Sequence, residues 1–185
     1  MRRARTIGYL MALVAGLLAA PAYAADPVLL NFGLLGGVGG PLDADDPDPG
    51  FSHPSFEFQV GVVTEPRTLV QLRLGRIDFG DEDQLGSTFR PQLDYVTLSG
   101  EYRVYRNWYD SGIFFGLGGY RLSGNQGAVG GREDEHTAIG LTGGVTGEFE
   151  ITRHFAILGQ LSGHYADLDE AQLFATAMGG LAIKF

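Results

Sequence analysis

Residues 173–185, LFATAMGGLAIKF, form an alternating segment that ends on an aromatic side chain. Apolar or small residues at the odd positions, such as Leu181 and Ile183, interleave with Thr176, Met178 and Lys184 at the even positions. Successive side chains of a β-strand point to opposite faces, so this spacing predicts a strand whose two faces meet different surroundings. The same period of two recurs in the rest of the chain.

Eight segments alternate in this way, and each has the roughly 9 to 11 residues that a tilted strand needs to cross a bilayer. The pattern is clearest where Val96, Leu98 and Tyr102 share one face and polar residues share the other. The predicted strands span residues 28–39, 55–64, 67–79, 93–106, 112–123, 136–151, 154–167 and 173–185.

The third predicted strand breaks the alternation. Val70, Leu72 and Leu74 lie on one parity, but Ile77 and Phe79 lie on the other. We expect a one-residue bulge near Gly75 and Arg76, because a bulge would return both side chains to the apolar face.

The connections between the predicted strands alternate in length. Short connections fall near 64–67, 106–111 and 151–154, and long ones run over about 40–54, 80–92, 123–135 and 166–172. This order predicts an all-β fold, an eight-stranded antiparallel up-and-down transmembrane β-barrel with short periplasmic turns, long external loops and both ends in the periplasm. A water-soluble β-sandwich has the same strand periodicity and remains the alternative.

Aromatic residues near the predicted strand ends suggest two girdles at the membrane surfaces. The periplasmic set would be Tyr105, Trp108, Tyr109, Phe155 and Phe185, and the external set Phe56, Phe79, Tyr95 and Tyr165.

The first residues predict export. Residues 1–24 carry three arginines, an apolar stretch over 7–20, and small residues at Ala22 and Ala24 that fit a cleavage site, so we expect a cleaved signal peptide. An uncleaved membrane anchor is the alternative. Cleavage would leave residues 25–185 as one outer-membrane β-barrel domain.

Composition narrows the function. The chain has no cysteine, which excludes disulfides and thiolate metal sites, and its formal charge of −9 argues against nucleic acid as a partner. Its 29 glycines, scattered among β-branched and aromatic residues, suggest strands that bend or pack closely.

The export signal, the eight strands, the four long loops and the terminal Phe185 together resemble the small eight-stranded outer-membrane β-barrel proteins, the group that includes OmpX, the OmpA membrane domain and the opacity-type adhesins. The resemblance implies a place in a Gram-negative-type outer membrane, in contact with lipid and lipopolysaccharide. It also implies that Phe185 is a C-terminal assembly signal for the β-barrel assembly machinery. We expect a monomer with a structural or surface-interaction role and no cofactor.

The inward face predicts an ion-pair network. Eight strands enclose a space that side chains just fill, and an unpaired charge there costs several kcal/mol. We therefore expect pairing across the lumen among Glu57, Arg73, Glu101, Arg103 and Glu148. A small gated pore for ions or solutes, in which these pairs exchange partners, is the functional alternative.

A lipid A-modifying hydrolase is a second alternative. Outer-membrane lipid A deacylases are similar eight-stranded barrels with a His-x-Ser pair on a late strand. Here Ser162-Gly163-His164-Tyr165-Ala166 has alanine at the position that would hold the nucleophile. Ser162 and His164 share a face that points inward, so we expect a hydrogen-bonded lumen histidine and no catalytic residue.

The four long loops are acidic. They hold thirteen of the 22 acidic residues, against Arg90 and Arg132 of opposite sign. Oxygen ligands at this density suit Ca²⁺ or Mg²⁺, but no loop has the full calcium-loop pattern, so the metal candidates are weak. The same loops are also a candidate surface for an unidentified partner. The weak metal candidates are Asp43, Asp45, Asp46 and Asp48.

Overall fold

The computed structural model describes residues 30–42, 51–79, 82–84, 87–106, 109–126, 134–168 and 171–185. The predicted signal segment 1–24 and the acidic run 43–48 lie outside these ranges. Within them, no helix combines the length and the apolar character that crossing a membrane requires.

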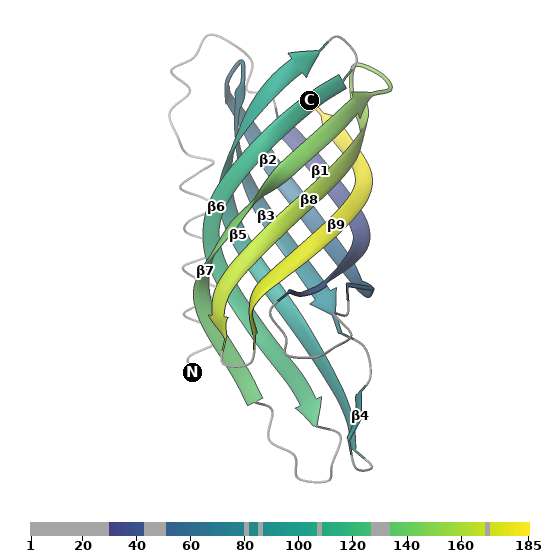
Figure 1. Ribbon diagram of the computed structural model, residues 1–185. Coiled ribbons are helices and arrows are strands. Elements are labelled where there is room, and N and C mark those ends of the chain that lie inside the picture. The colour runs from purple at the N-terminus through teal and green to yellow at the C-terminus, as the bar shows by residue number, and fades with distance from the viewer. Residues whose placement is uncertain are drawn as a thin grey trace.

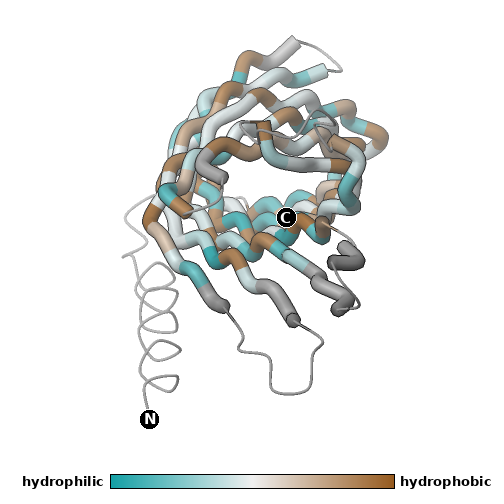
Figure 2. The backbone as a smooth tube through the Cα atoms, turned by 60° about the horizontal axis from the view of Figure 1, so that its bottom comes forward, coloured by the Kyte–Doolittle hydropathy of each residue, from teal (hydrophilic) through white to brown (hydrophobic). Residues whose placement is uncertain are grey.

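The described residues form nine strands in one antiparallel sheet. Strands that follow one another along the chain pair with each other, except that β3 pairs with β5 and not with β4. β9 pairs with β1, so the sheet closes (Figures 1 and 2). Since β4 is a three-residue addition to β5, the barrel itself has eight strands, which confirms the predicted fold class. The strands are β1 (Leu30–Pro41), β2 (His53–Glu65), β3 (Thr68–Asp78), β4 (Glu82–Gln84), β5 (Ser87–Arg106), β6 (Tyr109–Gln126), β7 (Asp134–Glu150), β8 (Phe155–Leu168) and β9 (Ala171–Lys184).

The two ends of the barrel differ. The first residue of β1 and the last residue of β9 lie at the same end of the barrel as the short connections 66–67, 107–108 and 151–154. We name this end of the barrel the turn end. There Leu30 and Phe185 exchange backbone hydrogen bonds of 3.0 and 2.9 Å, which seal the seam between β1 and β9. At the opposite end, which we name the loop end, the strands that follow one another are mostly separated by longer stretches of sequence.

Several strands extend further at the loop end than the sequence predicts, and β5 and β6 extend the most. β5 begins at Ser87 instead of 93, β6 continues to Gln126 instead of 123, and β7 begins at Asp134 instead of 136. Pairing continues there from Phe89 with Gln126 inward, so part of the expected loops is a β-ribbon (Figure 1). The extension lacks an apolar face because it needs none outside hydrocarbon, and sequence alternation therefore misses it.

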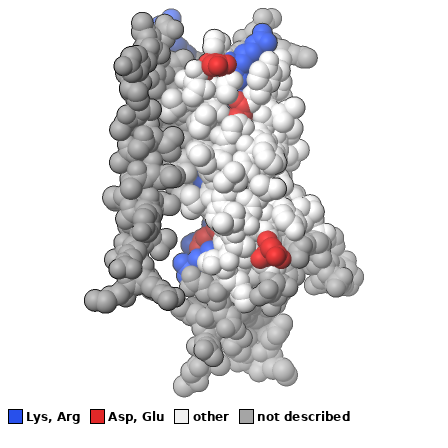
Figure 3. Space-filling model, turned by 90° about the vertical axis from the view of Figure 1, so that its left-hand side faces the viewer, with Lys and Arg blue, Asp and Glu red and all other residues white. Residues whose placement is uncertain are grey.

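The alternation places successive side chains in the lumen and on the outer surface. Figure 2 shows the matching change between hydrophilic and hydrophobic residues along the strands. On β8, Ile157 and Leu161 are exposed and Leu158 and Gln160 are buried. No outward residue of the described β8 is charged from Phe155 to Tyr165, a run of the length that a tilted strand needs to cross hydrocarbon. On the face shown in Figure 3, the charged side chains gather toward the two ends of the barrel.

The prediction of a bulge near Gly75 and Arg76 in β3 is wrong. The β2–β3 register runs without a shift from Ser55 opposite Ile77 to Val63 opposite Leu69. Ile77 points into the lumen, where it is fully buried, and Arg76 points outward and pairs with Asp94 at 2.6 Å. The change of parity has a different cause, because the lumen itself becomes apolar near the loop end.

Several inward glycines give space to a large side chain of the neighbouring strand. Gly75 faces Tyr95 across β3 and β5, and a Cβ at Gly75 would collide with the tyrosine ring. Gly144 gives space to Phe114 in the same way. The expectation of closely packed strands is thus met by cross-strand pairs of glycine with a bulky residue.

Replacing Gly75 with alanine is expected to lower the free energy of unfolding by about 1–3 kcal/mol, because the Tyr95 ring has to move. The control is Gly100→Ala on β5, where a Cβ meets no atom within 4 Å, and there we expect a change within about 0.5 kcal/mol. Urea unfolding of the refolded barrel, followed by heat-modifiable gel mobility, measures both. Equal stability of the two variants would contradict this packing.

Candidate functional site

Arg73 lies at the centre of the lumen and is 1% exposed. Its Nε donates to Ser99 Oγ at 2.9 Å, and its guanidinium carbon lies 3.6 Å from the centre of the Phe114 ring. The two terminal nitrogens donate to four side-chain oxygens, and the two shortest of these hydrogen bonds are 2.6 and 2.7 Å long. These acceptors are Gln160 Oε1 (2.6 Å), Gln71 Oε1 (2.7 Å), Glu101 Oε2 (3.2 Å) and Glu57 Oε1 (3.5 Å).

These contacts join opposite walls of the barrel. Arg73 is on β3 and Gln160 on β8, which are four strands apart in either direction around the ring. Gln160 Nε2 also donates to Glu57 at 3.0 Å, and Gln59 Nε2 donates to Gln160 at 2.7 Å. Side chains therefore bridge the lumen from wall to wall at this level.

A chain of alternating charges continues from Arg73 toward the turn end. Glu101 accepts from Arg103 at 2.8 Å, and Arg103 donates to Glu148 at 3.0 Å. Lys184 forms ion pairs with Glu148 and, at 2.9 Å, with Glu150. All five residues expected in the lumen lie in this chain and in direct contact with their neighbours.

Sequence reasoning left Lys184 and Glu150 out of the network. Lys184 has the inward parity of β9, but β8 lies between β9 and Glu150 on β7. The inward residue of β8 at that level is Ala156, which is fully buried and leaves space for the lysine stem. A long cation beside a small residue on the intervening strand is the signal that would have found the pair.

An apolar cluster closes the lumen near the loop end. Tyr95 belongs to it, and the Tyr95 hydroxyl donates to Glu57 Oε2 at 2.6 Å, which couples the cluster to the polar network. The expected external girdle is therefore wrong at Tyr95, which is buried in the lumen, and at Phe79, which packs against the cluster. The buried members are Ile77, Leu93, Tyr95, Tyr120, Ala166, Leu168 and Phe174.

Ser162 and His164 lie together in the lumen, with Ser162 Oγ 3.2 Å from His164 Nε2. Tyr120 donates to the Leu141 carbonyl at 3.1 Å, so its oxygen accepts from His164 Nδ1, also at 3.1 Å. Nε2 is then the acceptor for the Ser162 hydroxyl. A tyrosine takes the place that a carboxylate holds in a serine hydrolase triad, and both residues are buried in the filled lumen.

A groove of about 830 Å³ runs over the outer surface of β5 to β9. Its lining includes Tyr102, Ile113, Gly147, Ile157 and Gly159. Tyr102, Ile113 and Ile157 are exposed, so the groove opens toward the surroundings of the barrel, and no acidic residue, histidine, lysine or arginine is among its lining residues.

Two further sequence candidates are the terminal Phe185 and the acidic run of the first long loop. Phe185 is exposed on the outer surface at the turn end, and its ring meets Phe32 edge to face at 6.0 Å. Asp43, Asp45, Asp46 and Asp48 lie outside the described residues.

A closed eight-stranded barrel with an uncharged outer band and a polar, filled interior defines a small transmembrane β-barrel. The family described as "Outer membrane protein beta-barrel domain" matches residues 10–179, and the chain belongs to this family. The protein is therefore a bacterial outer-membrane protein, which confirms the family and the location that the sequence predicts.

Solved structures of similar fold include surface proteins of other bacteria. Ail, the attachment invasion locus protein of Yersinia pestis, has 16% identity and a TM-score of 0.58, over 85% of this chain and 97% of that chain. Neisserial surface protein A has 13% identity and a TM-score of 0.62 over the same shares. The N-terminal barrel of Pseudomonas aeruginosa OprF has 13% identity and a TM-score of 0.58, again over 85% and 97%. A search of curated proteins found no match.

Removing the Arg73 charge is expected to destabilise the barrel strongly. Arg73→Met leaves Glu57 and Glu101 buried without their cation, and loss of one partner of a buried pair costs about 3–5 kcal/mol. Arg76→Met, three residues along β3, breaks only the exposed pair with Asp94 and is expected to cost at most about 1 kcal/mol. Urea unfolding in detergent micelles measures both, and similar losses would contradict the role of Arg73.

Proposed function

We propose that the protein is a closed, non-enzymatic outer-membrane barrel that presents its acidic loops as a contact surface. The observation that carries this proposal is the wall-to-wall contact of Arg73 on β3 with Gln160 on β8. A lumen bridged in this way favours a structural role for the barrel over a role as a pore. The function then depends on the loops that the barrel carries.

The charge of the loops indicates the chemistry of the partner. Acidic residues outnumber basic ones by thirteen to two in the four loop segments, so they attract cationic surfaces and repel polyanions. Ail has been solved in complex with sucrose octasulfate, a heparin analogue. We expect this chain to differ from Ail here, because sulfate groups and acidic loops carry the same sign.

The geometry argues against the two alternatives. A gated pore requires the Arg73 contacts to open together, although Arg73 has partners on both sides of the lumen. A hydrolase requires substrate to reach Ser162, which is buried between Thr176 and His164. Neither requirement fits a tightly bonded interior.

Residues 1–24 are inferred to be a cleaved signal peptide, with Phe185 as the residue that the assembly machinery recognises. We infer that the turn end faces the periplasm and the loop end the outside, in a monomeric barrel. The exposed position of Phe185 at the turn end supports this orientation.

The purified, refolded protein is expected to show no steady single-channel openings in a planar bilayer, because the lumen is bridged. A barrel of known open conductance, refolded in parallel, controls for insertion. Steady openings from the protein with a single conductance level would overturn the closed lumen and favour the pore.

Bacterial cells that display the protein are expected to adhere to a surface coated with polylysine more than to one coated with heparin. A variant with asparagine at Asp43, Asp45, Asp46 and Asp48 is the test, because it removes four charges from one loop and leaves the barrel intact. We expect its adhesion to polylysine to fall severalfold at low salt. Unchanged adhesion of the variant, or better adhesion to heparin, would contradict the proposed surface.

A further inference from the structure

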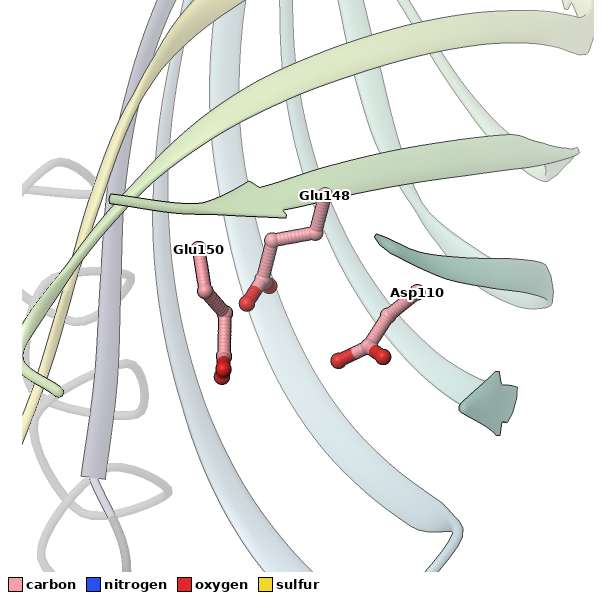
Figure 4. Close-up of side chains that lie close together, drawn as sticks. All are labelled: Asp110, Glu148 and Glu150. Carbon is pink, nitrogen blue, oxygen red and sulfur yellow. The ribbon is translucent and has the colours of Figure 1, made fainter. Parts of the chain in front are cut away.

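Three carboxylates gather at the turn end of the lumen, away from the acidic loops. Asp110, the second residue of β6, lies opposite Glu148 on β7, and Glu150 follows Glu148 by two residues on the same face. One oxygen from each lies within 4.8 Å of the others, and Figure 4 shows the three side chains converging.

Two of these carboxylates have partners and the third has none. Glu148 pairs with Arg103 and Lys184, and Glu150 pairs with Lys184. Asp110 is 7% exposed, and its carboxylate forms no hydrogen bond or ion pair with any residue that the structure describes. A buried carboxylate aimed at two others is unfavourable unless a cation lies between them.

The lumen charges also fall short of balance. Glu57, Glu101, Glu148, Glu150 and Asp110 give five negative charges, against three positive charges from Arg73, Arg103 and Lys184. The described lumen and its mouth therefore carry a net −2, and the excess lies at the turn end. One divalent cation would neutralise it.

We propose that Asp110, Glu148 and Glu150 bind a calcium ion at the turn end of the barrel. Calcium takes oxygen ligands at 2.3–2.6 Å, so oxygens up to about 4.8 Å apart can all reach one central ion. Magnesium, with ligands at about 2.0–2.1 Å and strict octahedral geometry, fits this spacing less well. Water completes the coordination, since Glu150 is at the open mouth.

Lys184 competes with the ion for the same oxygens. Its ammonium contacts both Glu148 and Glu150, so calcium binding requires the lysine to move aside. The lysine side chain is 23% exposed, which gives its charged end a route to water. Arg103 meanwhile keeps its contact with Glu148 Oε2. When calcium binds, it replaces the Lys184 ammonium as the cation beside Glu148 and Glu150.

Terbium luminescence tests this site on the full refolded protein. Tyr109 precedes Asp110 on β6, and its ring contacts Phe149, the residue between Glu148 and Glu150, so a tyrosine donor lies across the barrel wall from the proposed ion. The expected result is sensitised terbium emission that calcium displaces. Asp110→Asn is expected to weaken binding by about tenfold or more, the size typical of losing a supporting group at a metal site.

A second variant distinguishes binding at this site from nonspecific attraction of calcium to an acidic protein, because the expected change in its calcium affinity has the opposite sign. Lys184→Met removes the competitor and is expected to tighten calcium binding severalfold, although it makes the protein only one charge more negative. Asp94→Asn, which removes an acid from the loop end, is the matched control and is expected to leave binding unchanged. Heat-modifiable mobility checks that each variant folds.

Three results would overturn the proposal. These are wild-type emission that calcium does not displace, equal loss of binding in Asp110→Asn and Asp94→Asn, and weaker binding in Lys184→Met. The result does not depend on the loops, so the proposed contact surface stands or falls separately.

Discussion

The Arg73 guanidinium lies between two walls of the barrel that are four strands apart, and the rest of the interior is arranged around it. A charge in so narrow a space is tolerated only with several acceptors, and Arg73 has five side-chain oxygens as acceptors and an aromatic ring beneath it. The carboxylates that neutralise Arg73 are in turn held by Arg103 and Tyr95. Each buried charge in this network is stable because a neighbouring side chain neutralises it or donates a hydrogen bond to it.

The same constraint accounts for the distribution of glycine. Where a bulky lumen side chain leans over the adjacent strand, that strand has a glycine, as at Gly75 beneath Tyr95 and Gly144 beneath Phe114. The outer face follows other requirements, because hydrocarbon tolerates apolar side chains of any shape. The interior therefore depends on specific pairs of residues, whereas the exterior depends only on a general apolar character.

Strand number, parity and the main lumen charges were predictable because they follow from a period of two and from the cost of a lone buried charge. The errors share a physical origin. Ile77, Phe79 and Tyr95 were interpreted as lipid-facing because they are apolar or aromatic, although an apolar layer inside the lumen satisfies them equally. Lys184 with Glu150, and the isolated Asp110, depend on contacts across strands, which periodicity along one strand does not contain.

The ribbon formed by β5, β6 and β7 carries the ends of these strands beyond the uncharged band of the barrel. From Asp94, where the uncharged band of β5 ends, the strand continues seven residues to Ser87, about 23 Å at 3.3 Å per residue. At a strand tilt of about 40° this amounts to a rise of roughly 18 Å. A hydrogen-bonded backbone loses less conformational entropy on binding a partner than a free chain does. The ribbon can therefore extend away from the membrane and bind with a smaller entropic penalty.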